Sequence, residues 1–408
     1  MKITIIAILS FLPLKGFGQS NPLTIQQAID EALKNNASVR AAEYEVETKK
    51  QLKKTSFDLP KTDVTLLYGQ YNSYAKNDNE ITISQTIPFT ALGSQGALNR
   101  SMVASSELKK EVTENELIYQ VKQVYFQLAF IQARHGLLLK QDSIYEGFLK
   151  SASLRYKTGE TNLLEQTTAQ VQSNEIKNQL RINESEMIVL RSQLKTLLNT
   201  KSLPEITDSR LVALQFNDIP DTNALTSNPS LAYMRQQIDV ARSQKKVEAA
   251  KFAPKLLVGF FSQTLIGTPN EDGSITNSGD RFTGFQVGLA IPLWFAPHQG
   301  RVKAAEFNKL AAQSNYEYYR ISLQGQLQQA AQQYVKNNSS LEYFNKSALP
   351  NADLILKQSQ AAFHGGEIGY AEYLLSLRNA IGIKESYLKT LNDYNQSIIY
   401  IEYLSGNK

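Results

Sequence analysis

The stretches Tyr156-Lys157-Thr158-Gly159-Glu160 and Phe363-His364-Gly365-Gly366-Glu367 decide the fold of this chain. Each lies between two long helical patterns, and each carries Gly at the centre of a short polar turn. Gly permits the positive φ that a tight connection between two helices requires. The sequence therefore predicts two long helical hairpins with tips near residues 159 and 366.

Other landmarks also occur twice and in the same order. They pair Asn36-Ala37-Ser38-Val39 with Asn228-Pro229-Ser230-Leu231, Phe57-Asp58-Leu59-Pro60-Lys61 with Phe252-Ala253-Pro254-Lys255, and Ile87-Pro88-Phe89 with Ile291-Pro292-Leu293. The separation grows from 192 residues at Asn36 and Asn228 to 207 at Gly159 and Gly366, mainly in a strand-to-strand loop, where length changes are tolerated. We infer an internal duplication with repeat 1 at 20–200, a linker at 201–223 and repeat 2 at 224–408.

The composition indicates a folded protein and excludes several function classes. Of 408 residues, 42% are hydrophobic and 20% are charged, and the net charge of +5 comes without a basic cluster, so no nucleic-acid partner is expected. The chain has no Cys, which excludes disulfides, thiolate metal sites and a lipidated N-terminal Cys. An absence of thiols suits an oxidising compartment.

The N-terminus is predicted to be a signal peptide, residues 1–19. Lys2 precedes an apolar run from Ile3 to Leu14, and small residues follow around Gly18. The alternative is a plain N-terminal anchor, although the run is shorter than the roughly 20 residues of a spanning helix. No later stretch has the length and hydropathy of such a helix, so any crossing of a membrane is expected to use strands.

The hairpin arms carry apolar residues in steps of four and three. In repeat 1 this pattern includes Leu117, Val121, Val124, Leu128 and Ile131, and Asn183 lies on the returning seam; in repeat 2 it includes Leu323, Leu327, Ala330, Tyr334 and Asn337. This period is typical of helices that pack as coiled coils. The arms from Gly96 to about Ser151 and from Gly300 to about Gln360 would each be roughly 80–90 Å long.

Four short segments alternate between apolar and small or polar residues and are predicted to be strands. They lie at about 62–71, 80–89, 255–263 and 284–292, and the third is the weakest because it is apolar on both parities. Alternation over about ten residues is typical of a transmembrane β-strand, and a soluble four-stranded sheet is the alternative. Four strands cannot close a barrel in lipid, so a trimer with a 12-stranded β-barrel is expected.

Taken in order, these features resemble the TolC family of outer-membrane export channels over essentially all of the mature sequence. The opening stretch 23–36 and the two tips carry the resemblance, with Ala37 standing where the family usually has Pro. The resemblance implies an α+β fold of long helical hairpins plus four transmembrane strands per protomer. It also implies a homotrimer in outer-membrane lipid, with the helices in the periplasm. The heavy-metal and drug efflux branch is the nearest match.

No motif in the sequence supports catalysis or a cofactor. His135, His298 and His364 lack the spacing that places two metal ligands on one helix face, and nucleotide-binding and serine-hydrolase motifs are missing. We therefore expect neither an enzyme nor a metal site. His135 is expected to be a packed residue of the helical seam.

The gate candidates follow the tip glycines. Glu372 and Glu165 each stand six residues after Gly366 and Gly159, and the resemblance implies that an acid at the Glu372 position lines a closed entrance, with Tyr370 and Tyr373 as neighbouring candidates. The alternative is a solvated carboxylate near a helix start. The family's second gate acid is absent because Leu375 occupies its place. Adaptor docking is expected at Thr158, Gly159, Glu160, Gly365, Gly366 and Glu367.

The resulting prediction is an outer-membrane channel of a tripartite efflux system that passively exports small toxic solutes or metal ions. Its partners would be a periplasmic adaptor and an inner-membrane pump of the resistance-nodulation-division type. The alternatives are an exit duct for type I protein secretion and a soluble periplasmic coiled-coil scaffold. Aromatic residues at strand ends fit an interfacial belt, with ordinary core packing as the alternative: Tyr68, Tyr71, Tyr74, Phe89, Phe285, Trp294 and Phe295.

Overall fold

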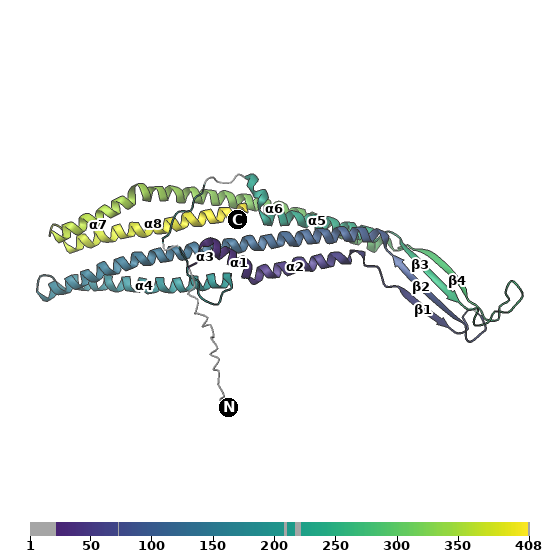
Figure 1. Ribbon diagram of the computed structural model, residues 1–408. Helices are drawn as coiled ribbons and strands as arrows, with labels where there is room; N and C mark the ends of the chain where they lie inside the picture. Colours follow the sequence, from purple (N-terminus) through teal and green to yellow (C-terminus); the bar gives the residue numbers. More distant parts are fainter. Residues whose placement is uncertain (1–21, 72, 208–209, 217–221, 407–408) are drawn as a thin grey trace, which may run out of the picture. The chain divides into compact units, whose positions relative to one another are not determined.

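The computed structural model describes residues 22–71, 73–207, 210–216 and 222–406. The predicted signal peptide, 1–19, lies outside these residues. The described chain is mostly helical with one small sheet (Figure 1). None of the described helices combines the length and hydropathy of a helix that crosses a membrane.

The chain forms two compact units, each assembled from three separate segments. The hairpin unit contains residues up to Asn36, Leu117–Phe216 and Gln333–Ile399. The sheet unit contains Ala37–Glu116, Asn217–Gln332 and Tyr400–Lys408. Each sequence repeat therefore supplies segments to both units.

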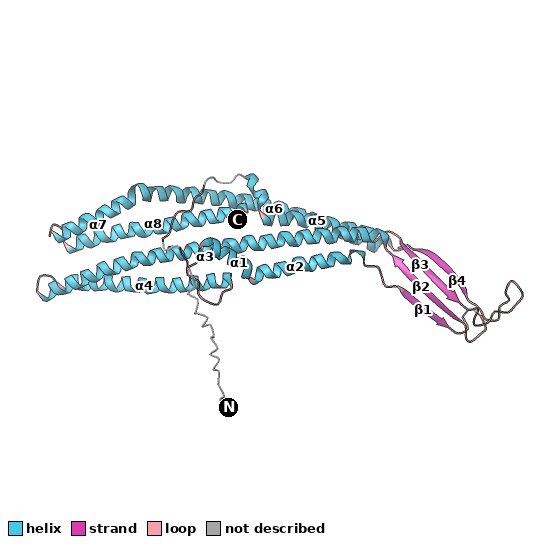
Figure 2. Ribbon diagram, viewed as in Figure 1, coloured by secondary structure: helices cyan, strands magenta, loops and turns pink. Residues whose placement is uncertain are grey.

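The sheet unit contains four antiparallel strands in the order β1-β2-β3-β4 (Figure 2, magenta). They are β1 (Asp63–Tyr68), β2 (Asn79–Ile87), β3 (Lys255–Gln263) and β4 (Phe282–Ala290). β3 coincides with the segment expected at 255–263, whereas the predictions for β2 and β4 extended two residues too far. β2 ends directly before Pro88 and β4 ends two residues before Pro292, because Pro has no N–H for the ladder.

One face of this sheet is apolar and exposed. The register places Val64, Ile83, Phe260 and Phe285 in one row across the four strands. On β4 the exposed fraction is 85% for Phe285 and 75% for Val287. Phe285 thus lies mid-strand, so its predicted place at a strand end is wrong. The alternation predicted the correct face for Phe285, but the strand begins at Phe282 and not at Gly284 as expected.

The opposite face explains why β3 is apolar on both parities. Phe261 lies opposite Gly284, and Gln286 lies opposite Gly259. A Cβ on Gly284 would be 2.6 Å from Phe261 Cζ, and a Cβ on Gly259 would be 2.6 Å from Gln286 Nε2. Phe261 and Gln286 therefore each rest on a glycine of the neighbouring strand.

The sheet unit also contains helices α2 (Ala37–Lys54) and α5 (Pro229–Ala250), with the first parts of α3 (Phe89–Lys157) and α6 (Phe295–Tyr343). Asn228 caps α5 by accepting from Leu231 N at 2.9 Å, and its Nδ2 donates to Leu404 O at 2.9 Å. In the hairpin unit, Asn36 Nδ2 donates to Leu197 O at 2.9 Å. The duplicated asparagine therefore makes the same bond in both repeats. The two acceptors, Leu197 and Leu404, are 207 residues apart, which is also the separation of Gly159 and Gly366.

The hairpin unit contains α1 (Ile25–Asn35) and two hairpins, shown in Figure 1. The first joins α3 to α4 (Leu163–Leu198), and the second joins α7 (Leu349–His364) to α8 (Tyr370–Ser405). The predicted seam residues Val121, Leu128 and Ile131 are buried. Asn183 on α4 is fully buried, and its Nδ2 donates to Ile131 O at 3.3 Å.

One predicted arm is interrupted. The sequence predicts a continuous helix to about Gln360, but a π-helical turn, Phe344–Ala348, separates α6 from α7. Pro350 follows directly, and its missing N–H removes one α-helical hydrogen bond. A widened turn before Pro accommodates this loss without ending the helix.

Candidate functional site

The two hairpin tips have the same backbone turn. Gly159 and Gly366 have φ of 78° and 73°. Glu160 N donates to Arg155 O, and Glu367 N donates to Ala362 O, both at 2.8 Å. This six-to-one bond around a left-handed glycine is the Schellman termination of a helix. The turns are therefore structural duplicates with Gly required at 159 and 366, whereas Gly365 has ordinary helical φ of −76°.

The acid after the first tip is engaged within its own hairpin. Asn162 caps α4 by accepting from Glu165 N at 3.0 Å. The Glu165 carboxylate accepts from Arg155 Nη1 at 3.0 Å and from the Thr161 hydroxyl. Its side chain is only 17% exposed. Glu165 therefore has a counter-charge on the neighbouring turn of α3.

The acid after the second tip has a different environment. Glu372 lies in the first turn of α8 and is exposed. Among the described residues it makes no ion pair, and the position matching Arg155 is occupied by Ala362. The first turn of a helix stabilises a carboxylate through the helix dipole. Glu372 therefore presents an uncompensated negative charge to its surroundings.

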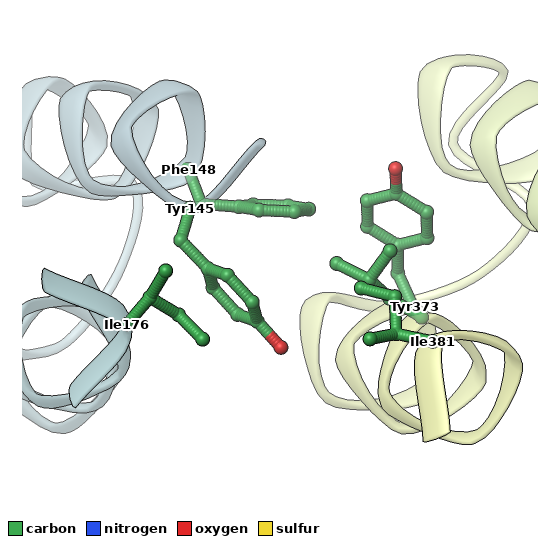
Figure 3. Packing of buried hydrophobic residues seen from close by; sticks show 6 residues of the cluster. Tyr145, Phe148, Ile176, Tyr373 and Ile381 are labelled. Atoms are coloured by element: carbon green, nitrogen blue, oxygen red, sulfur yellow. The ribbon is translucent and has the colours of Figure 1, made fainter. Parts of the chain in front are cut away.

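Aromatic rings join the two hairpins near their tips. Phe148 of α3 lies 4.9 Å from Tyr373, 5.7 Å from Tyr370 and 5.8 Å from Phe363, measured between ring centroids. Phe363 and Tyr373 stack with centroids 4.7 Å apart. Figure 3 shows Phe148 pointing from its hairpin towards Tyr373, with Tyr145 and Ile176 below it. We call these four rings, Phe148, Phe363, Tyr370 and Tyr373, the tip clasp.

Tyr370 also borders a cleft between the hairpins. The cleft has a volume of about 590 Å³ and is lined in part by Tyr145, Glu165, Leu374 and Arg378. The Tyr370 hydroxyl is buried and has no hydrogen-bond partner among the described residues. Burial, with the nearby Glu165 carboxylate, raises the pKa of Tyr370 to about 12. The hydroxyl is therefore neutral at any physiological pH.

The structure brings together some of the predicted gate residues. Glu165, Tyr370 and Tyr373 lie around the clasp and its cleft, whereas Glu372 faces away from the cluster. Leu375 is half exposed and lines the cleft. The sequence analysis missed Phe148. Its signal was present, because buried positions after Leu138 continue as Gln141, Tyr145, Phe148 and Ala152 in steps of three and four.

The histidines do not form a site. His298 contacts Phe252 at 5.5 Å between ring centroids, His364 contacts Phe363 at 6.2 Å, and His135 is partly buried on α3. No group of three His, Asp or Glu side chains suited to a metal ion occurs in the part of the chain that the structure describes.

Comparison with known proteins identifies the family. The family model described as outer membrane efflux protein matches residues 222–407. Cobalt-zinc-cadmium resistance protein CzcC of Cupriavidus metallidurans is 22% identical over 405 residues, covering 97% of this chain and 93% of CzcC. The second repeat of this chain thus matches the outer membrane efflux protein family. The resemblance to TolC-like channels is thereby confirmed.

Two further proteins are similar to this chain. The probable outer membrane lipoprotein SilC of Salmonella typhimurium is 21% identical over 395 residues, covering 91% of this chain and 84% of SilC. The crystal structure of CusC superposes with a TM-score of 0.77 at 17% identity, covering 95% of this chain and 93% of CusC. The family description and the name of SilC both refer to outer-membrane proteins. The family consists of transporters rather than enzymes.

Proposed function

We propose that this protein is a passive outer-membrane channel of a tripartite efflux system, assembled as a homotrimer with a 12-stranded β-barrel. The observation that carries the proposal is the exposed apolar face of the sheet, with Phe285, Val287 and Leu289 all more than 60% exposed. Strands β2 to β4 have nine residues each, or roughly 30 Å at about 3.3 Å per residue. With a tilt of about 40°, this length matches the roughly 25 Å apolar band of an outer-membrane barrel.

Strand edges support the trimer. β1 and β4 each pair on one side only, so each leaves a row of backbone N–H and C=O groups. Lipid cannot satisfy such groups, and a closed barrel removes them. Three copies of a four-stranded sheet would close the ring by pairing β1 of one protomer with β4 of the next. The glycine-backed face, with Phe261 and Gln286, would then line the lumen.

The hairpin tips supply a gate and a docking surface in this proposal. Three copies of Glu372 near the trimer axis would form a ring of like charges, which attracts cations and favours opening by repulsion. The tip clasp would oppose opening by holding the two hairpins of each protomer together. The residues Thr158, Gly159, Glu160, Gly365, Gly366 and Glu367 would receive the hairpin of a periplasmic adaptor.

The relatives' names suggest the cargo and partners. CzcC is named for resistance to cobalt, zinc and cadmium, which supports metal ions or small toxic solutes as exported cargo. A pump of the resistance-nodulation-division type would supply the energy, because the sequence has no nucleotide-binding motif. SilC is named a lipoprotein, whereas these 408 residues contain no Cys for acylation.

The testing experiment compares two neighbouring substitutions on β4. Val287→Arg places a charge on the apolar face, where Arg costs roughly 2–4 kcal/mol at the bilayer midplane, and should impair insertion or trimer stability. Gln286→Arg, which would face the lumen, should be milder. Outer-membrane fractionation, trimer content in detergent and conductance in planar bilayers are the measurements. Equal damage from both variants, or a monodisperse monomer that needs no detergent, would refute the channel and favour the periplasmic scaffold.

A further inference from the structure

The two ends of the sheet differ in charge. At the end that adjoins the helices, the segments 53–63, 87–95, 248–255 and 291–303 carry the cations Lys53, Lys54, Lys61, Lys251, Lys255, Arg301 and Lys303, against the acids Asp58, Asp63 and Glu248. At the other end, the loops 69–78 and 264–281 carry Lys76 and Arg281 against Asp78, Glu271, Asp272 and Asp280. We call these the helix-side end and the loop end. The first is basic and the second is acidic.

Two acids close to this end, Glu248 and Glu306, are already paired with lysines. Glu306 accepts from Lys245 and Lys309, both at 2.8 Å, and the hydrogen bond from Lys245 contributes most to lowering its pKa. Glu248 pairs with Lys251 at 2.7 Å. The cations Lys255, Arg301 and Lys303 are exposed and make no ion pair with any residue that the structure describes. Their charge is therefore available to an external anion.

Exposed aromatic residues lie at the same end. Trp294 is 81% exposed, Phe57 is 73% exposed and Phe89 is 53% exposed. Phe252 packs against Phe295 at 5.6 Å and edge-on against His298 at 5.5 Å, and His298 in turn contacts Arg301. Phe252, His298 and Lys303 line a cleft of about 290 Å³. Rings and cations thus form one surface where α5 ends and α6 begins.

The arrangement occurs in both repeats. The corner before β1 contains Phe57 and Lys61 around Pro60, and the corner before β3 contains Phe252 and Lys255 around Pro254. The corners after β2 and β4 carry Phe89 and the pair Trp294 and Phe295. Antiparallel order brings all four corners to the helix-side end of the sheet.

We propose that the helix-side end binds anionic phospholipid, with Trp294 and the flanking rings among the acyl chains and with Arg301 and Lys303 on the headgroup phosphates. Amphipathic rings favour the membrane boundary, and each Lys or Arg near an anionic surface adds about fivefold in affinity. The inference rests on the proposed channel function, because it needs the sheet to lie in a bilayer. The phospholipid bound would belong to the leaflet on the helix side of the sheet.

The single tryptophan of the chain makes a direct test available. The full-length protein is reconstituted in phosphatidylethanolamine vesicles, and the fluorescence of Trp294 is quenched by brominated phosphatidylglycerol or by brominated phosphatidylethanolamine. We expect the phosphatidylglycerol probe to quench at several-fold lower mole fraction. The double variant Arg301→Gln, Lys303→Gln should lose this preference, and Lys76→Gln at the loop end should keep it.

The outcomes separate the inference from the function on which it rests. Equal quenching by the two lipids in the wild type, or the same loss in Lys76→Gln, overturns the headgroup site while leaving the channel intact. No quenching by either lipid would place Trp294 outside the bilayer and overturn the proposed channel as well. Soluble inorganic phosphate should not restore or abolish the preference, whereas added salt should weaken it, since exposed charges are screened.

Discussion

The two hairpin tips are copies of one turn that have acquired different chemistry. Both end a helix with the same six-to-one hydrogen bond around a left-handed glycine, and both place Glu six residues later. After the first tip, Glu165 is paired with Arg155 and mostly buried. After the second, Glu372 is exposed without a counter-charge on its own hairpin. Duplication preserved the backbone and left the charges to diverge.

This difference favours the second tip as the proposed gate. A carboxylate already paired at 3.0 Å contributes little field to its surroundings, whereas an unpaired one contributes its full charge. The second tip also supplies three of the four clasp rings, Phe363, Tyr370 and Tyr373. The first tip instead exposes Leu163 and Leu164. We infer that the first tip is a fixed support and the second is the working element.

The largest effect is expected from the clasp. Phe148 is 7% exposed and touches three rings of the second hairpin, so Phe148→Ala should lose about 3–5 kcal/mol of packing. We expect faster amide exchange in residues 370–380 and a higher open probability in bilayer recordings. Leu154→Ala, at a 64% exposed position on the same helix, is the matched control and should change neither. Unchanged exchange at the second tip in Phe148→Ala would show that the clasp does not hold the hairpins.

The next effect concerns the two acids. Glu372→Gln should lower cation preference in single-channel recordings. Multivalent cations that block from the periplasmic side should also bind more weakly, because the substitution removes three negative charges from a trimer. Glu165→Gln should change selectivity much less, since Arg155 already compensates that charge. Should Glu372→Gln keep the wild-type selectivity and block, Glu372 is a solvated residue at a helix start and the division of roles between the tips is wrong.

The sequence predicted the parts of the fold that depend on local pattern. Period-two alternation predicted the strands because one face of the sheet is uniformly apolar. β2 and β4 end earlier than predicted, before Pro88 and Pro292. The seam residues followed from the steps of four and three until Leu138. Beyond it Tyr145 and Ala152 stay on the extrapolated series, whereas a local phase shift buries Gln141 and Phe148 one position before the residues that the series predicts. A phase shift is set by packing against the neighbouring helix, which a single helix's pattern does not specify.

The site was harder to predict for a similar reason. Identical spacing made Glu165 and Glu372 look equivalent, and the residue that separates them, Arg155, lies ten positions before Glu165 across the turn. Its counterpart, Ala362, carries no charge. Likewise the clasp joins Phe148 to rings more than 200 residues away. Such contacts depend on how the two hairpins meet, and sequence periodicity contains no information on that.

The smallest effect tests whether Tyr370 is as enclosed at the second tip as the clasp requires. Burial raises its pKa to about 12, against about 10 for an unfolded tyrosine, so the folded tip disfavours the phenolate. The stability from this burial is complete below pH 10 and is lost as the pH rises from about 10 to about 12. Burial also raises the pKa of Tyr394 to about 12, so absorbance titration near 295 nm should lose one of two tyrosinate transitions near pH 12 in Tyr370→Phe, and the alkaline loosening of residues 370–380 should diminish with it. If Tyr370→Phe instead removes a transition near pH 10, the Tyr370 hydroxyl is open to water. The second tip would then be no more enclosed than the first.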